Sequence, residues 1–424
     1  MYDRYWEKSK TWIVYSILLI YLVLSPVSGM LSVIGIMPSV PWIYLILLLL
    51  ILYLILNFIQ LPDIRFTPAV NVYYMIGAGL LVYVIYAELV SGSMLMHSLP
   101  GQEATARTLL ASTTILFAFF FIAGGKLTDL NNLLQSKNVQ ILTIIFYLIY
   151  CAAIYWTALN YSAVNTAANT LITLDARFNY LFISDTFAIF TFIVMWLVVK
   201  STTLRWTIAV NSLTLLYITR SRTVFFLFIL CLLISLILQA KNKKNWLILG
   251  VIVGLLFLLG RDNLILQNQN SIIFSLVFDA SSDESYIARQ ELFATGIRAL
   301  KDYWFLGLPL AELWSEAPGE YLHNYLSFWV CFGIVPFTSF VAISLYCIRK
   351  LITLIRKYPL NGLTMFLVIY FTFVYIEIIT SRSYVYPYVW TCLSAVPVIY
   401  NHCMNKAEII DDANWQSGGE SKKK

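Results

Sequence analysis

The stretch VPWIYLILLLLILYLILNFIQ, residues 40–60, decides the fold class of this chain. It holds no charged residue, and its length suits the about 20 apolar residues that an α-helix needs to cross a bilayer. Similar runs recur along the 424 residues, of which 60% are hydrophobic and only 12% are charged. A soluble domain has about a quarter of its residues charged. The sequence therefore predicts an all-α polytopic membrane protein.

Apolar runs of spanning length predict about twelve transmembrane helices. These helices are expected near residues 11–29, 40–60, 69–90, 108–125, 139–160, 181–200, 203–219, 223–240, 246–260, 322–348, 363–380 and 384–403. The first run lacks a small-residue cleavage site, so we interpret it as a helix rather than a signal peptide. Residues 1–403 are expected to form a single transmembrane domain that includes a large outside loop at 261–321. Residues 404–424 are polar and are expected to form a cytoplasmic tail without structure.

The basic residues set the predicted orientation. If the N-terminus is cytoplasmic, 19 of the 28 lysines and arginines lie inside, so the positive-inside rule favours two cytoplasmic termini. Of the 15 lysines 14 lie inside, whereas 8 of the 13 arginines lie outside. The planar fork of arginine binds carboxylate or phosphate oxygens in pairs. The outer face therefore favours an anionic ligand, although any single arginine is also explained by snorkelling at the interface.

Several classes of site have little support in the sequence. The six cysteines all lie in predicted helices without a CxxC pair, so we interpret them as packing residues. Only three histidines occur, and no His/Cys/Asp cluster has the spacing of a metal site. No P-loop or dinucleotide fingerprint is present. We therefore expect no metal and no cofactor. The net charge of +6 is explained by the basic residues of the predicted inside segments, so we expect no nucleic-acid partner either.

The outside loop contains a predicted helix from about residue 283 to 301. Ser281-Ser282-Asp283-Glu284 has the form of a capping box, and apolar positions from 292 to 300 recur at helical spacing. Arg289 lies on that apolar stripe, where a guanidinium needs a ligand or an ion-pair partner. Arg298 lies on the polar face, with Asp302 four residues later as a candidate partner.

His323 follows the loop at the predicted start of a long helix. Its ordinary pKa of about 6.5 leaves it mostly neutral at pH 7, so it can accept a proton. A lone histidine at an interface is also explained as an amphipathic anchor. Arg220 and Arg222 mark a tight connection between two spans, and Arg382 completes the outer basic set. Glu88, Asp185 and Glu377 lie near the outer ends of their helices, where such groups line a cavity or pair with arginine.

Three separated patches resemble the bacterial O-antigen polymerase and O-antigen ligase superfamily. The first is Thr219-Arg220-Ser221-Arg222-Thr223 before an apolar helix. The second is Arg289-Gln290-Glu291-Leu292-Phe293, running on to Lys301-Asp302-Tyr303-Trp304-Phe305-Leu306-Gly307. The third is His323-Asn324 with Gly333 downstream. The chain departs from the family at Trp304, where proline is common, and at Pro336, near which a second glycine is usual.

The resemblance implies a membrane-embedded glycosyltransferase of the GT-C-like type in the bacterial inner membrane, with a cavity open to the periplasm. Its substrate would be an oligosaccharide on undecaprenyl pyrophosphate, whose oxygens suit paired arginines. In the implied inverting transfer, His323 is the general base. Arg222 and Arg289, with Arg220, Arg382, Arg298 and Asn324, bind the substrate and its pyrophosphate.

Four functions remain open from the sequence. A polymerase would join repeat units, and a chain-length regulator would be a possible partner. A ligase would transfer finished polysaccharide to lipid A core with the same residues. A transporter of lipid-linked sugars is less favoured, because we find no internal repeat and the charges lie near helix ends. A receptor or scaffold subunit would not need arginine outside in preference to lysine.

Overall fold

The computed structural model describes residues 2–33, 35–38, 40–59, 68–98, 103–162, 180–219, 221–239, 284–309, 322, 324–358 and 360–420. Every regular element in these ranges is a helix. The helices are α1 (Tyr2–Leu19), η1 (Ile20–Leu24), α2 (Ser25–Val33), α3 (Trp42–Ile59), α4 (Pro68–Ser98), α5 (Glu103–Gly125), α6 (Leu127–Leu134), α7 (Lys137–Ser162), α9 (Tyr180–Ile193), η2 (Val194–Val198), α10 (Thr202–Ile218), α11 (Arg222–Leu238), α14 (Glu284–Asp302), α15 (Leu326–Phe332), α16 (Ile334–Lys357), α17 (Gly362–Thr380) and α18 (Tyr388–Glu420).

Six of the described helices are long and apolar enough to cross a membrane, so this is a multi-pass membrane protein. A seventh candidate is the bent pair of α5 and α6, whose axes meet at 69°. Two shorter apolar helices, Trp42–Asn57 and Arg222–Leu238, match spans expected near 40–60 and 223–240. The span expected near 246–260 lies outside the described residues. The described part of the chain therefore shows fewer candidate spans than the twelve expected.

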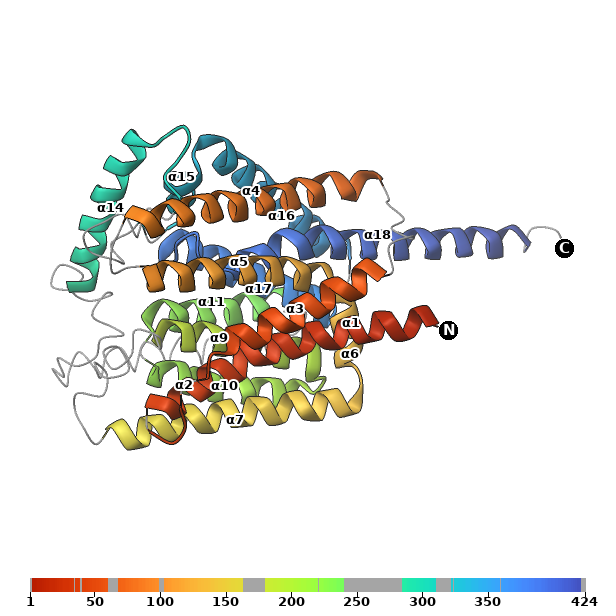
Figure 1. The fold of residues 1–424 in the computed structure, drawn as a ribbon. Helices are drawn as coiled ribbons and strands as arrows, with labels where there is room; N and C mark the ends of the chain where they lie inside the picture. Colours follow the sequence, from red (N-terminus) through yellow and green to blue (C-terminus); the bar gives the residue numbers. More distant parts are fainter. Residues whose placement is uncertain are drawn as a thin grey trace.

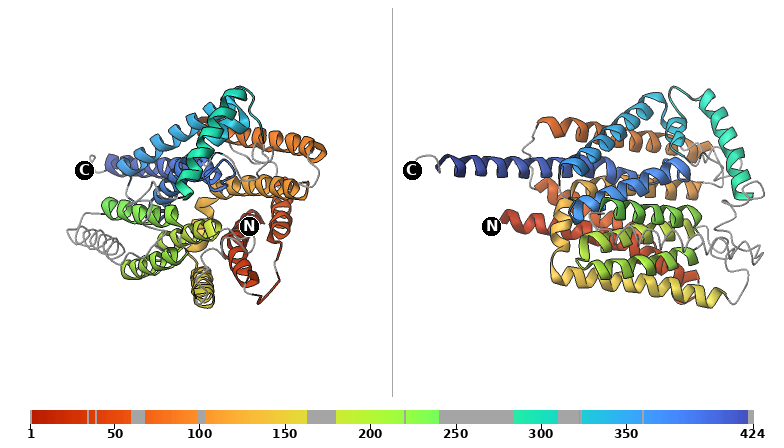
Figure 2. Two further views of the ribbon diagram at one scale, coloured as in Figure 1. Left: turned by 90° about the vertical axis from the view of Figure 1, so that its left-hand side faces the viewer. Right: turned by 180° about the vertical axis from the view of Figure 1, so that it is seen from behind.

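The helices run side by side in a bundle with both chain termini at one end (Figure 1). Helix α14 lies at the opposite end, which we call the distal end. Figure 2 views the molecule from this end and from behind, and both views show α14 lying across the ends of the bundle helices. The helix predicted in the loop from about residue 283 to 301 is thus confirmed as α14.

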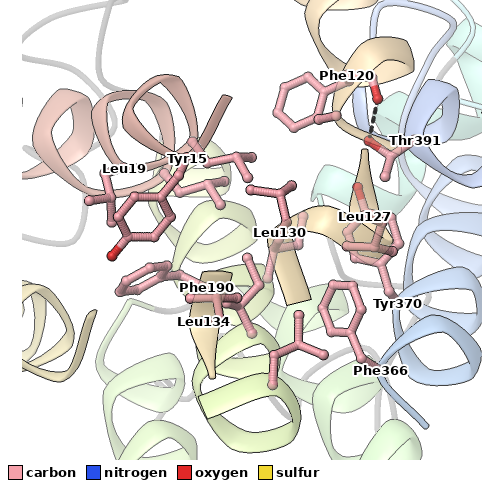
Figure 3. Close-up of a pocket in the computed structure, with 16 residues that line it drawn as sticks. Tyr15, Leu19, Phe120, Leu127, Leu130, Leu134, Phe190, Phe366, Tyr370 and Thr391 are labelled. Carbon is pink, nitrogen blue, oxygen red and sulfur yellow. Dashed lines mark hydrogen bonds between the residues drawn. The ribbon is translucent and has the colours of Figure 1, made fainter. Parts of the chain in front are cut away.

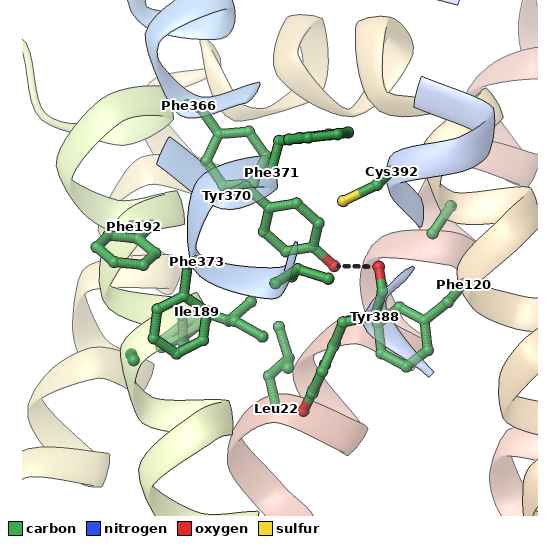
Figure 4. Close-up of a cluster of buried hydrophobic side chains, with 14 of the residues drawn as sticks. Leu22, Phe120, Ile189, Phe192, Phe366, Tyr370, Phe371, Phe373, Tyr388 and Cys392 are labelled. Carbon is green, nitrogen blue, oxygen red and sulfur yellow. Dashed lines mark hydrogen bonds between the residues drawn. The ribbon is translucent and has the colours of Figure 1, made fainter. Parts of the chain in front are cut away.

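Burial separates central helices from peripheral ones. About four fifths of the span windows in Tyr180–Val198 and Gly362–Thr380 are buried, against 28% for Val72–Ser91. In the centre, the Tyr370 hydroxyl of α17 donates to the backbone oxygen of Tyr388 at 3.2 Å, among phenylalanine rings from α5, α9 and α17 (Figure 4). A buried hydroxyl needs such a partner. The bundle is therefore a packed protein core with other helices left to face lipid.

The prediction of one continuous helix over 322–348 is wrong, because the structure has two helices there. Helix α15 ends at Phe332 and α16 begins at Ile334, with Gly333 between them at φ +80°. L-residues rarely adopt this conformation, and glycine lacks the Cβ that forbids it. The break lets the chain cross another segment closely, as described below.

The C-terminal segment also differs from its expectation. Residues after 404 were expected to lack structure, but α18 continues to Glu420 and projects beyond the other helices on the side of the termini (Figure 1). Adding residues to a helix that is already formed avoids the cost of nucleation, so a polar stretch can continue it. No disulfide joins the six cysteines, all of which lie in described helices, and five of them are buried, as expected for packing residues.

Candidate functional site

An ion pair at the distal end joins two segments that are far apart in sequence. Arg382 Nε and one terminal nitrogen each donate to a different carboxylate oxygen of Asp185, both at 2.9 Å. Asp185 lies in the first turns of α9, and Arg382 lies in the 381–387 loop between α17 and α18. Both side chains are buried. Such a two-pronged contact is the geometry for which arginine is suited and lysine is not.

A second carboxylate completes this cluster. Glu377 Oε2 lies 3.6 Å from Arg382 Nε, and its side chain is fully buried. Burial by itself lowers the pKa of Arg382, but the carboxylates of Asp185 and Glu377 raise this pKa well above its usual range. The guanidinium is therefore permanently charged. We call Asp185, Glu377 and Arg382 the distal ion cluster.

The end of α17 shapes the loop that holds Arg382. The backbone oxygen of Glu377 accepts hydrogen bonds from the amides of Ser381 and Arg382, at 2.8 and 2.9 Å. The Ser381 hydroxyl also donates to the Glu377 carboxylate. These bonds satisfy carbonyl and amide groups that a helix end otherwise leaves unpaired. The turn thus directs Arg382 back toward α9.

The first predicted patch is anchored beside this cluster. Ser184, the residue before Asp185, donates its hydroxyl to Thr219 Oγ1 at 2.9 Å. Thr219 ends α10, and Arg222 is the first residue of α11, with a half-buried side chain. Thr219 therefore lies against the turn of α9 that holds Arg382. Arg220 lies outside the described residues.

The third predicted patch contacts the same loop. The amide of Tyr384 donates to Ser327 Oγ at 2.7 Å, and the rings of Tyr384 and Phe332 meet edge to face with centroids 5.3 Å apart. Ser327 and Phe332 belong to α15. Asn324 Oδ1 accepts the amide of Leu326 at 2.9 Å, so this side chain caps the start of that helix. His323 lies outside the described residues, between Leu322 and Asn324.

The second and third patches meet at a crossing of two glycines. Gly307 and Gly333 have φ of +76° and +80°, and a Cβ on either would strike the backbone of the other segment. Two hydrogen bonds close the crossing, from Leu308 N to Val330 O at 2.7 Å and from Ile334 N to Phe305 O at 3.3 Å. Both glycines of the family resemblance therefore serve one contact. We call this contact the glycine crossing.

Helix α14 also contacts the residue before His323. Gly296 leaves the room that the buried side chain of Leu322 occupies. This helix includes Arg289, whose side chain is not among those that the structure describes. Arg298 is exposed, and its guanidinium donates to Thr295 Oγ1 at 3.2 Å rather than pairing with Asp302. The predicted apolar stripe is wrong at Phe293, which is half-exposed.

The contacts thus bring Arg222, Asn324 and Arg382 to one end of the bundle, whereas the side chain of Arg298 on α14 is exposed. Sequence reasoning noted Asp185 and Glu377 without partners and did not single out Ser184, Ser327 or Tyr384. A usable signal was the polar run Ser184-Asp185-Thr186 inside an otherwise apolar helix, because a buried polar group needs a partner.

A cavity elsewhere in the bundle is not part of this site. It measures about 40 Å³ and is lined almost wholly by apolar side chains, among them Leu130, Phe190 and Phe366 (Figure 3). Its polar wall residue Thr391 already donates to the backbone oxygen of Phe120 at 2.9 Å. A cavity of this size and lining holds no sugar or phosphate, so we interpret it as a packing void.

Comparison with known proteins adds one finding. No curated protein and no solved structure matches the chain. Residues 207–341, about a third of the chain, match the family model Wzy_C, described as O-Antigen ligase. The match covers all three patches of the resemblance and ends before Arg382. The chain therefore carries, at residues 207–341, the Wzy_C O-antigen ligase domain that O-antigen polymerases and ligases share.

Proposed function

We propose that this membrane protein is a polymerase that joins oligosaccharide repeat units carried on undecaprenyl pyrophosphate into O-antigen or a related surface polysaccharide. The Wzy_C domain supports a transferase that acts on lipid-linked glycans. The observation that carries the proposal is the convergence at the distal end. Thr219, Arg382 and Ser327 are linked through Ser184–Asp185 and Tyr384, which supports a single site for the first and third patches.

The reaction is inverting glycosyl transfer. An acceptor hydroxyl attacks the anomeric carbon of the donor sugar, and His323 takes the proton of that hydroxyl as general base. The bond from this carbon to the pyrophosphate oxygen breaks, and undecaprenyl pyrophosphate departs with the electron pair. Arg222 and Arg289 stabilise the charge that develops on it. A base of this kind contributes about 10²- to 10⁴-fold in rate.

The other predicted residues take different parts. Arg220 remains a candidate for pyrophosphate binding. Arg382 is already held by two carboxylates, which favours a positioning role over direct contact with substrate. Asn324 caps α15 and thereby fixes the chain next to His323. The exposed position of Arg298 suits a contact with the oligosaccharide rather than with a pyrophosphate.

The proposal includes a setting for this chemistry. The fold is a GT-C-like membrane glycosyltransferase with about twelve spans in the bacterial inner membrane. The distal end faces the periplasm, and both termini lie in the cytoplasm; their common position at one end of the bundle supports this arrangement. A pyrophosphate is a good leaving group, so the reaction needs neither metal nor nucleotide sugar. A regulator of chain length is a candidate partner.

A ligase is the second candidate, and the description of the matching family favours it. It would use the same residues to move finished polysaccharide to lipid A core. Incubation of the purified protein with one lipid-linked repeat unit, without lipid A core, separates the two. A ladder of products on a gel is expected for a polymerase. Product formed only after lipid A core is added would identify a ligase, and no product in either mixture would contradict sugar transfer.

Variants of two residues test the mechanism. We expect His323→Ala to abolish the polymer, because no other group is assigned to take the proton, while His402→Ala on α18 serves as a control and keeps activity. Arg222→Lys should fail nearly as badly as Arg222→Ala, because lysine cannot make a paired contact. Normal polymer from His323→Ala at normal protein abundance would overturn the assignment of the base.

A further inference from the structure

A second hollow lies at the distal half of the bundle, between the peripheral helices α4 and α16. Its volume is about 350 Å³. The walls come from α4, from the turn before Gly307, from the end of α15 and from the start of α16, and the lining residues are Ile76, Leu80, Tyr83, Phe305, Leu306, Phe332, Val335, Pro336 and Ser339. We call this hollow the α4–α16 groove. It opens between two helices that each qualify as membrane spans.

The side chains that line this groove favour the binding of a hydrocarbon chain over that of a polar group. Seven of the nine lining residues have purely apolar side chains. Ser339 donates its hydroxyl to the backbone oxygen of Val335 at 2.9 Å, and the Tyr83 hydroxyl donates to the backbone oxygen of Phe332 at 3.5 Å. The two polar side chains in the wall are therefore turned to protein acceptors. A sugar or phosphate here would lose its hydration without finding partners.

The groove is continuous with the candidate site. Phe332 lines the groove, and its ring also contacts Tyr384 in the loop of Arg382. Phe305 and Leu306, which also line the groove, belong to the glycine crossing that holds this segment against the junction of α15 and α16. The side chain of Leu306 is 75% exposed and that of Val335 62%, which is costly at a face in contact with water and favourable at one in contact with lipid.

We infer that the α4–α16 groove binds the isoprenoid units nearest the pyrophosphate of the lipid-linked substrate, which leaves the head group beside the 381–387 loop that Arg382 positions. This inference rests on the proposed function, since it assumes a polyprenyl carrier. A lipid whose head must enter a protein site needs a path for its tail back into the bilayer. The groove supplies such a path directly beside the elements that carry Asn324 and Arg382.

Photo-crosslinking tests the occupant without requiring activity. A photoreactive phenylalanine analogue is introduced at Ser339 in the groove or at Leu345, a 60% exposed position on α16 outside it. Membranes that hold the full-length protein are supplied with undecaprenyl phosphate and irradiated, and the adducts are identified by mass spectrometry. We expect about tenfold more polyprenyl adduct at 339 than at 345. Phospholipid adducts alone at 339, or equal polyprenyl adducts at both positions, would overturn the inference.

Kinetics provide a second, independent measurement. Ile76→Trp narrows the groove, and Val82→Trp adds the same bulk to an exposed face of α4 outside it. We expect Ile76→Trp to raise KM about tenfold for a donor with a full undecaprenyl tail and to leave KM unchanged for a donor with a tail of two isoprene units. Equal effects of both variants, or on both donors, would contradict the groove. A native protein that transfers no sugar but gives the polyprenyl adduct at 339 would contradict the function alone.

Discussion

Two ion clusters, each with two carboxylates, lie at opposite ends of this molecule. At the distal end Arg382 lies between Asp185 and Glu377, and at the end of the termini Lys126 lies between Glu7 and Asp129, at 2.7 and 3.2 Å. The distal side chains are almost fully buried, whereas those of Glu7 and Asp129 are about half-exposed. We call the second group the terminal ion cluster. The comparison indicates that burial, more than the number of charges, decides how much the loss of one partner lowers the free energy of unfolding.

The two clusters also differ in the chemistry of their cation. Arg382 uses a rigid fork on Asp185, which fixes the angle as well as the distance between α9 and the 381–387 loop. Lys126 reaches two carboxylates with a single flexible ammonium. A lysine cluster tolerates small shifts of its elements, and a buried arginine fork does not. The distal cluster is thus suited to hold a site, and the terminal cluster to join helices at a surface.

The largest effect is expected from removing the distal cation. Arg382→Met leaves two carboxylates buried without a counter-charge, and breaking a buried pair in this way costs about 3–5 kcal/mol. The midpoint of thermal unfolding in detergent, followed by tryptophan fluorescence, should fall sharply. In the double variant Asp185→Asn with Arg382→Gln, part of this loss should be recovered, because one buried charge is removed with its partner. A midpoint for Arg382→Met equal to that of the native protein would contradict the comparison.

The glycine crossing gives the next effect. Gly333→Ala forces a Cβ into the backbone of Phe305 and imposes a conformation that L-residues rarely adopt, which costs about 1–3 kcal/mol before any clash. Gly79→Ala is the matched control, because nothing lies within 4 Å of its Cβ. Thermal midpoints of both variants are measured together. A loss in Gly79→Ala as large as that in Gly333→Ala would show that the crossing is not special.

A smaller effect is expected where the 381–387 loop meets α15. Ser327→Ala leaves the buried amide of Tyr384 without its acceptor, at a cost of about 1–3 kcal/mol. Ser235→Ala is the control, because that buried hydroxyl only donates to a carbonyl of its own helix. We expect Ser327→Ala to lower both the thermal midpoint and the yield of polymer more than the control does. Equal midpoints would argue that the loop is held by other contacts.

The smallest effect is expected at the terminal ion cluster. Lys126→Met should cost about 1 kcal/mol or less, because its partners are partly hydrated. Raising salt from about 0.1 to about 1 M shortens the Debye length from about 10 to about 3 Å, so salt should remove most of the difference between Lys126→Met and the native protein. The loss in Arg382→Met should persist at high salt. The same salt dependence in both variants would remove the distinction between the clusters.

Much of the architecture was accessible from the sequence because it follows from local composition. Apolar runs predicted most of the described helices, and a capping pattern with periodic apolar positions predicted α14 to within one residue at each end. These features depend on residues within a few turns of one another. The break at Gly333 was missed because a glycine inside an apolar run is compatible with a continuous helix, and only its contact with Gly307 requires the break.

The candidate site was accessible only in part, for the same reason. The sequence singled out Arg222 and Arg382 as outer arginines, but it could not pair Arg382 with Asp185, which lies 197 residues away. Nor could it tell that the side chain of Arg298 would be exposed while Gly296 would contact Leu322. Which of several outer arginines meets a carboxylate depends on how the helices pack, and packing involves every helix at once.

The sequence by itself determined that this chain lies in a membrane and that its helices are apolar, and it predicted that arginine gathers on one side. These properties follow from the cost of placing charge in lipid, which each segment meets alone. The tertiary structure alone decided that Thr219 meets Ser184 of α9, that the 381–387 loop meets α15, and that one arginine is held between two buried carboxylates. Such a cluster is stable only when all three side chains are buried together, because any one of them buried alone would be an uncompensated charge and would destabilise the fold.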